Sequence, residues 1–395
     1  MSHPVYRTPH VSDDERKVIA SIDALRNELE YQVGQPRRWV GRLRRQTLAR
    51  AVQGSNSIEG YAASLDDVLA VEGGEEPLDA SRETQLALSG YQDAMTYVLQ
   101  RAQDDTVLTV DEGLLKSLHF MMIKHDLSKN PGRWRPGATF VRREPTGDLV
   151  YEGPSHDDVP LLIRHLLEEL ERNEAPVLVR AAMAHLNLAM IHPFSDGNGR
   201  MGRALQTLVL ARDTIVAPVF SSIEEYLGRN TAAYYGILSD VGQGAWHPEN
   251  DARPWVRFCL TAHYRQARTL LRRIEATDHL WVACMELVER NDLPERAVNA
   301  LMDAAQGLRI RRAGYIATVK LADAKEIAPL TATRDLKELV DSGLLIPSGE
   351  RRARVYVGSE GIRGIWQGIR ASRPPRPEED PFELSPEQLR LDATV

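Results

Sequence analysis

Apolar residues recur at intervals of three and four along most of the chain, which is the spacing that places side chains on one face of an α-helix. The first such face consists of Val18, Ile19, Ile22, Leu25 and Leu29. The same spacing returns in later segments, which cover residues 86–99, 114–123, 159–170, 177–191 and 204–211. The pattern predicts a mainly α-helical protein in which these helices form a bundle.

Two segments depart from helical spacing. Residues 139–141 and 149–151 are short strand-like runs on either side of a turn sequence at 145–148, which predicts a β-hairpin. After residue 306, two short helical patterns separated by a turn lead to apolar residues 343–345 and a strand-like run at 353–357. This order predicts a small winged-helix domain near the C-terminus.

These patterns divide the chain into five parts. They are an N-terminal helical region over 1–105, a helical core with the hairpin over 106–266, connecting helices over 267–306, the winged-helix domain over 307–360 and a tail over 361–395. From Ser372 the chain contains five prolines in 24 residues with an acidic excess. We therefore expect the tail to be partly disordered.

Composition places the chain among ordinary globular proteins. Its 49 Lys and Arg against 56 Asp and Glu give a net charge of −7, which argues against general coating of nucleic acid but leaves room for a local basic patch. Cys259 and Cys284 are the only cysteines, so no disulfide framework or cysteine metal cluster is expected. The sequence has neither an apolar signal core at its N-terminus nor a run of 18 apolar residues. We expect a cytoplasmic protein that does not enter membranes.

The most informative sequence is HPFSDGNGRMGR, over residues 192–203. It follows one predicted helix and opens the next. Gly197, Asn198 and Gly199 allow the backbone to approach a ligand closely, and their N–H groups lie at a helix N-terminus, which favours anions. The segment therefore predicts a phosphate-binding loop.

The charged residues of this segment fit the same chemistry. Arg200 and Arg203 are three residues apart, so both can clamp phosphoryl oxygens from one helix face. Asp196 offers a hard oxygen ligand suited to Mg²⁺, and His192 can act as a general base near neutral pH. A calcium loop is excluded because Thr207 stands where that motif requires glutamate.

The assembled segment resembles the signature of the Fic (AMP-transfer) family, His-x-Phe-x-Asp/Glu-Gly-Asn-Gly-Arg-x-x-Arg, and every specified position matches. Two further segments are similar to that family. Residues 132–135 with the hairpin and residues 151–154 look like its flap, which registers the target segment beside the nucleotide. Tyr234, Tyr235, Leu238 and Trp255 look like the helices that close its core. The resemblance implies a Fic-type helical bundle over about 106–266.

The resemblance also implies a role for each residue. His192 would deprotonate a Ser, Thr or Tyr hydroxyl of a target protein, which attacks the α-phosphate of ATP and expels pyrophosphate. Asp196 would hold Mg²⁺, while Phe194 packs beneath the loop. The nucleotide-binding residues would be Gly197, Asn198, Gly199, Arg200, Arg203, Tyr234 and Tyr235. Phosphate-transferring relatives carry Lys at the position of Gly199, so glycine favours nucleotidyl transfer.

A second motif resembles the family's inhibitory sequence, Ser/Thr-x-x-x-Glu-Gly/Asn. Ser55, Glu59 and Gly60 match it, at the end of a helical stretch from Val40 through Ala51 and N-terminal to the core, as in class II of the family. The resemblance implies that Glu59 pairs with Arg203 and takes the place of the γ-phosphate. The resting enzyme would then be slow. The alternative is an ordinary pair on a helix surface.

The C-terminal domain differs in charge from the rest of the chain. Residues 308–357 include ten basic and six acidic residues, a net of +4. Winged helices bind DNA or proteins. We expect target presentation or homodimerisation from this domain, with DNA as the alternative partner.

The sequence thus predicts a Mg²⁺-dependent protein adenylyltransferase that uses ATP, modifies target proteins and itself, and is restrained by Glu59. The alternatives are a DNA-binding regulator with a nucleotide-sensing or self-modifying Fic core, a de-AMPylase using the same site, and transfer of another nucleotide such as UMP. His119 and His185 lie on helical patterns and are expected to be packing or surface residues. Glu224 and Glu225 are expected on a solvated face.

Overall fold

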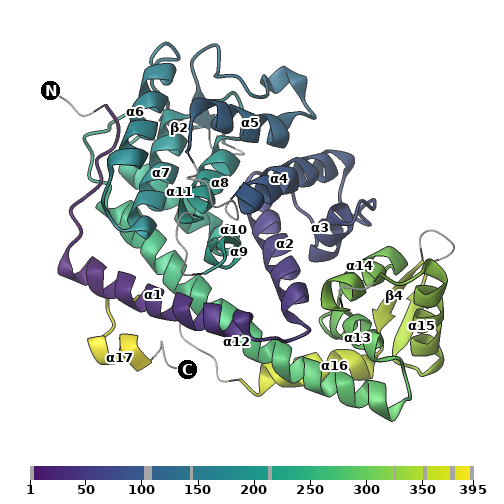
Figure 1. Ribbon diagram of the computed structural model, residues 1–395. Helices are drawn as coiled ribbons and strands as arrows, with labels where there is room; N and C mark the ends of the chain where they lie inside the picture. Colours follow the sequence, from purple (N-terminus) through teal and green to yellow (C-terminus); the bar gives the residue numbers. More distant parts are fainter. Residues whose placement is uncertain are drawn as a thin grey trace.

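The computed structural model describes residues 4–101, 109–142, 146–211, 216–323, 326–349, 354–373 and 379–391. Within these ranges the chain is mainly α-helical, with two short two-stranded sheets (Figure 1). The predicted fold class, a helical bundle with a β-hairpin, is confirmed. No helix in the described ranges combines the length and the apolar content that crossing a bilayer requires.

The N-terminal region consists of four helices. They are α1 (Asp13–Gly34), α2 (Val40–Ile58), α3 (Leu65–Glu72) and α4 (Arg82–Arg101). Helix α1 begins with a capping box, in which Ser12 and Glu15 each accept a hydrogen bond from the other's backbone N–H. Helix α2 is longer than its predicted stretch because Val52 and Ile58 continue its buried face.

The core region carries most of the remaining elements. They are α5 (Glu112–Ile123), η1 (Leu127–Lys129), β1 (Phe140–Arg142), β2 (Leu149–Glu152), α6 (Val159–Arg172), α7 (Val177–Ile191), α8 (Asn198–Leu210), α9 (Pro218–Ser221), α10 (Glu224–Arg229) and α11 (Thr231–Gly242). Helices α7 and α8 pack against each other and are buried on nearly every side. The loop that connects α7 and α8 is therefore anchored at both ends by buried helices.

Strands β1 and β2 form the predicted hairpin. They are antiparallel, with Val141 opposite Tyr151. The hydroxyl of Tyr151 donates to the backbone oxygen of Met190 at 2.7 Å, which fixes the base of the hairpin on the last turn of α7. Pro145 of the predicted turn lies outside the described residues.

One long helix, α12 (Arg253–Arg290), crosses the boundary that was predicted at residue 266. The helix does not end there because its buried face continues through Leu270, Leu271 and Ile274. Helix α12 runs beside α1 (Figure 1). The core and the connecting region are thus joined by a continuous helix.

The C-terminal elements form a smaller body beside α2 and the end of α12 (Figure 1). They are η2 (Glu295–Ala297), α13 (Val298–Ala305), α14 (Arg312–Asp323), α15 (Pro329–Asp341), β3 (Leu345–Ser348) and β4 (Val355–Gly358). Strands β3 and β4 are antiparallel, and Ile310 bridges to Tyr356 on the outer side of β4.

The described part of the predicted tail contains two helices. Residues Glu360–Ala371 form α16, whose apolar face packs on α12 and α13, so the predicted tail begins inside a helix. Helix α17 (Pro386–Leu391) packs on α1, where Ser21 donates to the backbone oxygen of Leu389 at 3.3 Å. Helices α16 and α17 thus pack the described part of the tail against the rest of the protein.

Candidate active site

The loop between α7 and α8 has a residue with positive φ at each of its ends. His192 closes α7 in the left-handed region with φ +51°, and Gly197 precedes α8 with φ +77°. The side chain of Asn198, the first residue of α8, accepts from the backbone N–H of Phe194 and donates to its oxygen, both at 2.9 Å. The Asn198 side chain therefore shapes the loop, and its backbone N–H lies in the first turn of α8.

Beneath this loop, Phe194 is fully buried and stacks on His119, with ring centroids 3.7 Å apart. His119 Nδ1 accepts from the N–H of Gly132, so Nε2 donates to the backbone oxygen of Asp196 at 3.0 Å. Burial lowers the pKa of His119 to about 4 and keeps it neutral. This histidine packs and orients the loop, as its helical position predicted.

His192 is arranged to accept a proton. Its Nδ1 lies 3.2 Å from the backbone oxygen of Ala189 and donates to it, which leaves the Nε2 lone pair for a substrate hydroxyl. Burial, followed by the nearby Arg135 guanidinium, lowers the pKa of His192 below its usual value. The ring is therefore neutral at neutral pH and can act as a general base.

Arg200 is the feature of the loop that most directly indicates an anion. Its side chain is 1% exposed, and Nε and Nη1 have no hydrogen-bond partner among the described residues. The ring of Tyr61 lies over its guanidinium at 5.2 Å, and the nearest carboxylate oxygen, from Asp196, is 3.9 Å from Nη2. Leaving such a group buried and unpaired is costly, so the site favours an anionic ligand.

Arg203, in contrast, is fully engaged. Its Nε donates to Ser55 Oγ at 2.7 Å, and its Nη2 donates to the Ser55 backbone oxygen at 2.9 Å and to Glu59 Oε1 at 2.6 Å. Burial alone would lower the pKa of Arg203, but Glu59 outweighs it and raises that pKa. The structure brings together Ser55, Glu59 and Arg203, the three residues that the inhibitory motif relates.

Glu59 also lies directly against the start of α8. A Cβ on Gly199 would stand 2.3 Å from Glu59 Oε1, so only glycine leaves room for the carboxylate here. Gly60, with φ +86°, allows the chain to turn immediately after Glu59. The carboxylate thus occupies the N-terminal turn of α8, where the sequence predicts phosphate.

The two predicted nucleotide-binding tyrosines contact the inhibitory elements. The Tyr234 hydroxyl lies 3.5 Å from Arg203 Nη1 and 3.0 Å from His185 Nε2, and the side chain is buried. The Tyr235 hydroxyl donates to the backbone oxygen of Ile58 at 3.2 Å. Burial lowers the pKa of His185 to about 3, so this histidine is a packed, neutral partner of Tyr234.

Asp196 is partly accessible beside the loop, with 33% of its side chain exposed. Its Oδ1 accepts from the N–H of Gly197 at 2.7 Å. The described residues contain no group of three or more His, Cys, Asp or Glu side chains suited to a metal. A single carboxylate nevertheless fits Mg²⁺, which is commonly held by one or two carboxylates together with substrate phosphates and water.

The expectation that Glu224 and Glu225 lie on a solvated face is wrong. Glu224 is 1% exposed and accepts from the hydroxyls of Tyr91 at 2.8 Å and Thr207 at 3.2 Å. Burial would raise the pKa of Glu225, but Arg273 outweighs it and lowers that pKa to about 2. These partners come from helices remote in sequence, so helical spacing carried no signal for them.

The comparison with protein families agrees with this geometry. Residues 109–210 match the model of the Fic/DOC family. This part of the chain is a Fic domain. The match contains α5, the hairpin and the α7–α8 loop with its histidine and both arginines.

The curated relatives that match this chain are protein adenylyltransferases by name. Protein adenylyltransferase fic-1 of Caenorhabditis elegans is 28% identical over 256 residues, which are 64% of this chain and 46% of that protein. Protein adenylyltransferase Fic of Drosophila grimshawi is 27% identical over 255 residues, 62% of this chain and 47% of that protein. The chain therefore spans about half the length of these relatives.

Solved structures share the fold. A Fic family protein from Desulfovibrio desulfuricans G20 superposes with a TM-score of 0.58 at 23% identity, covering 90% of this chain and 99% of that one. A fragment of Fic-1 from C. elegans gives a TM-score of 0.51 at 22% identity, covering 66% of this chain and 73% of the fragment. The Fic-type bundle that the resemblance implied is thus the observed fold.

Proposed function

We propose that this protein transfers AMP from ATP to a hydroxyl side chain of a target protein. One observation carries the proposal: a neutral histidine with a free Nε2 and a buried arginine whose Nε and Nη1 have no partner among the described residues lie at the same helix N-terminus. A base, an anion clamp and aligned backbone N–H groups are what phosphoryl chemistry requires. The names of the curated relatives support the same activity.

In the proposed reaction, Nε2 of His192 takes the proton of the target hydroxyl as its oxygen attacks the α-phosphorus of ATP. The bond between the α-phosphorus and the bridging oxygen breaks, pyrophosphate leaves with that oxygen, and AMP stays on the target. The N–H groups at the start of α8 stabilise the charge on the transferring group, and Arg200 binds the leaving phosphates. Close approach at Gly199 is possible because no side chain intervenes.

Asp196 is the residue that would hold Mg²⁺, through the Oδ2 atom that receives no hydrogen bond from the loop. A bound Mg²⁺ neutralises phosphate charge and helps to orient the leaving group. Asp196 itself is oriented by its bond to the Gly197 N–H, so its carboxylate is fixed beside the phosphate site.

We also propose that the protein rests in a restrained state. Glu59 binds Arg203 and covers Gly199, so the place of the terminal phosphate already holds a carboxylate. ATP must then adopt another pose or displace Glu59, and either outcome slows transfer. The same carboxylate is placed to orient a water, so removal of AMP from a target remains the alternative direction.

Helix α2, which carries Glu59, is held at two places along its length. Near its start, Arg42 donates to Asp303 at 2.8 Å and to Gln306 at 2.7 Å, both at the end of α13 in the C-terminal body. Near its end, Gly54 meets Gly228 of α10 so closely that a Cβ on Gly228 would stand 2.5 Å from the Gly54 Cα. These contacts support a brake that is part of the folded core.

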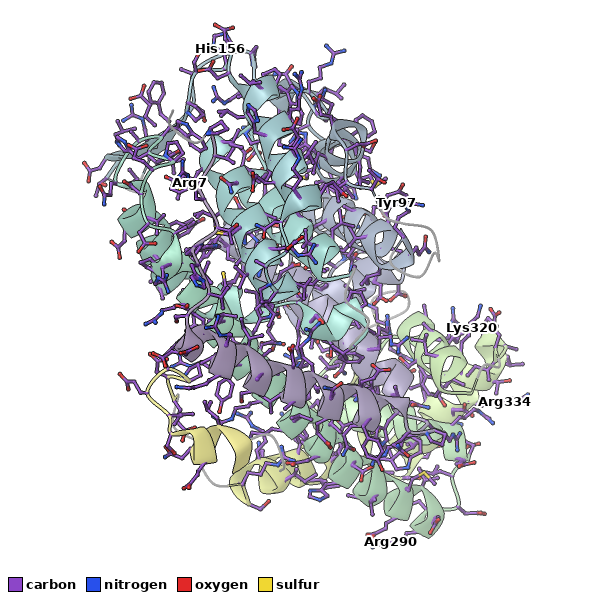
Figure 2. The ribbon with its side chains drawn as sticks, turned by 60° about the vertical axis from the view of Figure 1, so that its left-hand side comes forward. Arg7, Tyr97, His156, Arg290, Lys320 and Arg334 are labelled. Atoms are coloured by element: carbon purple, nitrogen blue, oxygen red, sulfur yellow. The ribbon has the colours of Figure 1, made fainter. Side chains whose placement is uncertain are left out.

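The C-terminal body fits a winged-helix domain, because α13, the bridging Ile310, α14, α15 and the β3–β4 hairpin follow in that order. Figure 2 shows Arg334 of α15 and Lys320 of α14 at its outer edge. Lys337 is exposed on α15 as well, but so are Glu338 and Asp341, and opposite charges alternate there. Residues 350–353, between β3 and β4, lie outside the described residues.

We therefore assign this domain to protein docking, with DNA as the alternative. A titration of fluorescent duplex DNA at several salt concentrations separates the two. Duplex binding that weakens steeply with salt, with no transfer from ATP, would favour the regulatory alternative.

The test of the proposed activity is intact-mass spectrometry of the Glu59→Gly protein after incubation with Mg²⁺ and ATP, GTP or UTP. The proposal expects the mass of one or more AMP groups with ATP. No adduct from folded protein with any nucleotide would overturn transfer, and a UMP or GMP adduct alone would change the nucleotide.

A further inference from the structure

Arg135 lies between the flap and the catalytic loop, and the sequence resemblance gave it no role of its own. The flap is here residues 137–142 and 146–154. Resting on the proposed function, we propose that Arg135 is a positioning residue that fixes His192 relative to the flap.

Arg135 binds the catalytic loop through both its backbone and its side chain. Its N–H donates to the backbone oxygen of Pro193 at 2.8 Å, and its Nε donates to the backbone oxygen of His192, also at 2.8 Å. His192 has a positive φ, which is uncommon for a residue with a side chain. The two bonds hold the peptide groups on both sides of this unusual turn.

The other end of the same guanidinium binds the flap. Nη1 donates to the oxygen of Gly137 at 2.6 Å, where the flap begins, and Nη2 donates to the oxygen of Pro154, where it ends. A Cβ on Gly153 would lie 3.5 Å from Arg135 Nη2 and 3.7 Å from the His192 Cβ, so flap, arginine and base meet at one point. One planar group therefore sets the distance between the flap and the base.

The charge of Arg135 has a second effect. The side chain is 4% exposed, and the four hydrogen bonds named for this residue all end on backbone oxygens, so no carboxylate neutralises it among the described residues. Three charged groups face His192: Arg135 from the segment that precedes the flap, Glu59 from the end of α2 and Asp196 from the loop. Arg135 opposes protonation of the ring, whereas Glu59 and Asp196 favour it.

Lysine and methionine variants separate the two effects. Arg135→Lys keeps the positive charge but lacks the planar guanidinium that binds both the catalytic loop and the flap. Arg135→Met removes both the charge and the guanidinium. In the Glu59→Gly protein, we expect Arg135→Lys and Arg135→Met each to slow auto-modification on the order of 10- to 100-fold at saturating ATP, since misplacing a reacting group is that costly. The KM for ATP should change less than about twofold, because Arg135 does not reach the phosphate site.

The pH dependence then distinguishes positioning from a general structural defect. Arg135→Met should raise the pKa of His192, seen as a shift of the acid limb of the rate to higher pH and in the NMR titration of its ring. Arg135→Lys should leave that titration where it is in the parent. Arg164→Met, at an exposed position on α6, is the control and should change neither quantity.

The inference and the proposed function fail in different ways. If the Glu59→Gly parent shows no transfer, the proposed function fails. The NMR titration of the His192 ring and the hydrogen exchange of the flap amides still test the inference about Arg135. An unchanged titration and unchanged flap exchange in folded Arg135→Met protein would overturn the inference. So would an unchanged auto-modification rate in that variant. Melting temperatures and circular dichroism identify any variant that does not fold. If Arg135→Met does not fold, Arg135→Lys tests whether the planar guanidinium is required.

Discussion

Glu59 Oε1 lies 2.6 Å from Nη2 of Arg203, although the two residues are 144 positions apart in the chain. The ion pair joins the end of α2 to the second turn of α8 and is largely buried, with Arg203 at 0% and Glu59 at 21% side-chain exposure. Charged pairs at this depth are sensitive to the loss of one partner. Much of the behaviour expected of the protein follows from this contact.

Replacing Glu59 should release the restraint. In Glu59→Gly, Arg203 regains a free guanidinium edge for the terminal phosphate, so auto-modification should rise on the order of tenfold or more. Glu59→Gln keeps the size of the side chain without its charge and should give a smaller increase. Incorporation of label from α-labelled ATP measures all three proteins, and an unchanged or lower rate in folded Glu59→Gly would contradict the restraint.

The pH dependence of transfer should follow His192. Because burial and Arg135 lower the pKa of His192 below 6.5, the active neutral ring predominates above that pH and is lost on the acid side. In the Glu59→Gly protein the acid limb should move lower still, since the carboxylate that favours protonation is gone. Initial rates at constant Mg²⁺ and ionic strength give the limb, and an acid limb above 6.5 would contradict this assignment.

Loosening α2 at its far end should also raise activity. Arg42→Met removes the bonds to Asp303 and Gln306 and leaves a half-buried carboxylate without its main partner, at a cost of about 2–4 kcal/mol in the free energy of unfolding. We expect auto-modification to increase even though Arg42 touches no active-site residue. The control is Leu339→Ala, at a buried position of α15, which should destabilise the protein without removing a contact to α2. If Leu339→Ala raises auto-modification as much as Arg42→Met does, the effect of Arg42→Met is a general loosening of the fold.

Gly199 should not tolerate a side chain. The methyl group of Gly199→Ala would stand 2.3 Å from Glu59 Oε1 and 3.1 Å from Arg203 Nη1, in the space that phosphate requires. In the Glu59→Gly background, where the first clash is absent, ATP affinity should still fall by about tenfold or more. Calorimetric titration with ATP checks this. Gly236→Ala is the matched control, since a Cβ there meets nothing within 4 Å.

Glu224 should make stability depend on pH in the opposite sense to a surface carboxylate. Burial raises the pKa of Glu224, so its folded form prefers the proton, and its contribution to stability is full at low pH and lost as pH rises through that pKa. Glu224→Gln keeps the shape without titrating. The melting temperature of the wild type relative to this variant should therefore fall as pH rises from about 4.5, and a rise over that range would contradict the assignment.

The sequence predicted those parts of the protein that are local in the chain. The 192–203 segment contains its own loop geometry, because the glycine at 197 and the amide of Asn198 act on residues within four positions. The hairpin and most helices also follow from short-range patterns. Glu59 and Arg203 could be paired only through the resemblance to known proteins, since nothing in their spacing relates them.

Contacts between remote segments were not accessible in this way. Arg135 binds His192 and both ends of the flap, yet in the sequence it is one arginine after a tryptophan. Glu224 and Glu225 belong to a short helix with too few residues to show a buried face, and their partners come from α4, α8 and α12. The boundary predicted at 266 falls inside α12, which continues its apolar stripe from the core into the connecting region.

The most direct measurement compares α- and γ-labelled ATP as donors for wild type, Glu59→Gly and Glu59→Gly with His192→Ala, each incubated with Mg²⁺ and a cell lysate and separated on a gel. The proposed function predicts protein bands labelled from α-labelled ATP, strongest with Glu59→Gly and absent once His192 is replaced. Kinases of the lysate label proteins from γ-labelled ATP in every lane, so the proposed function predicts no γ-labelled band that depends on His192. A γ-labelled band that disappears with His192, or α-labelled bands that persist without His192, would contradict AMP transfer by this site.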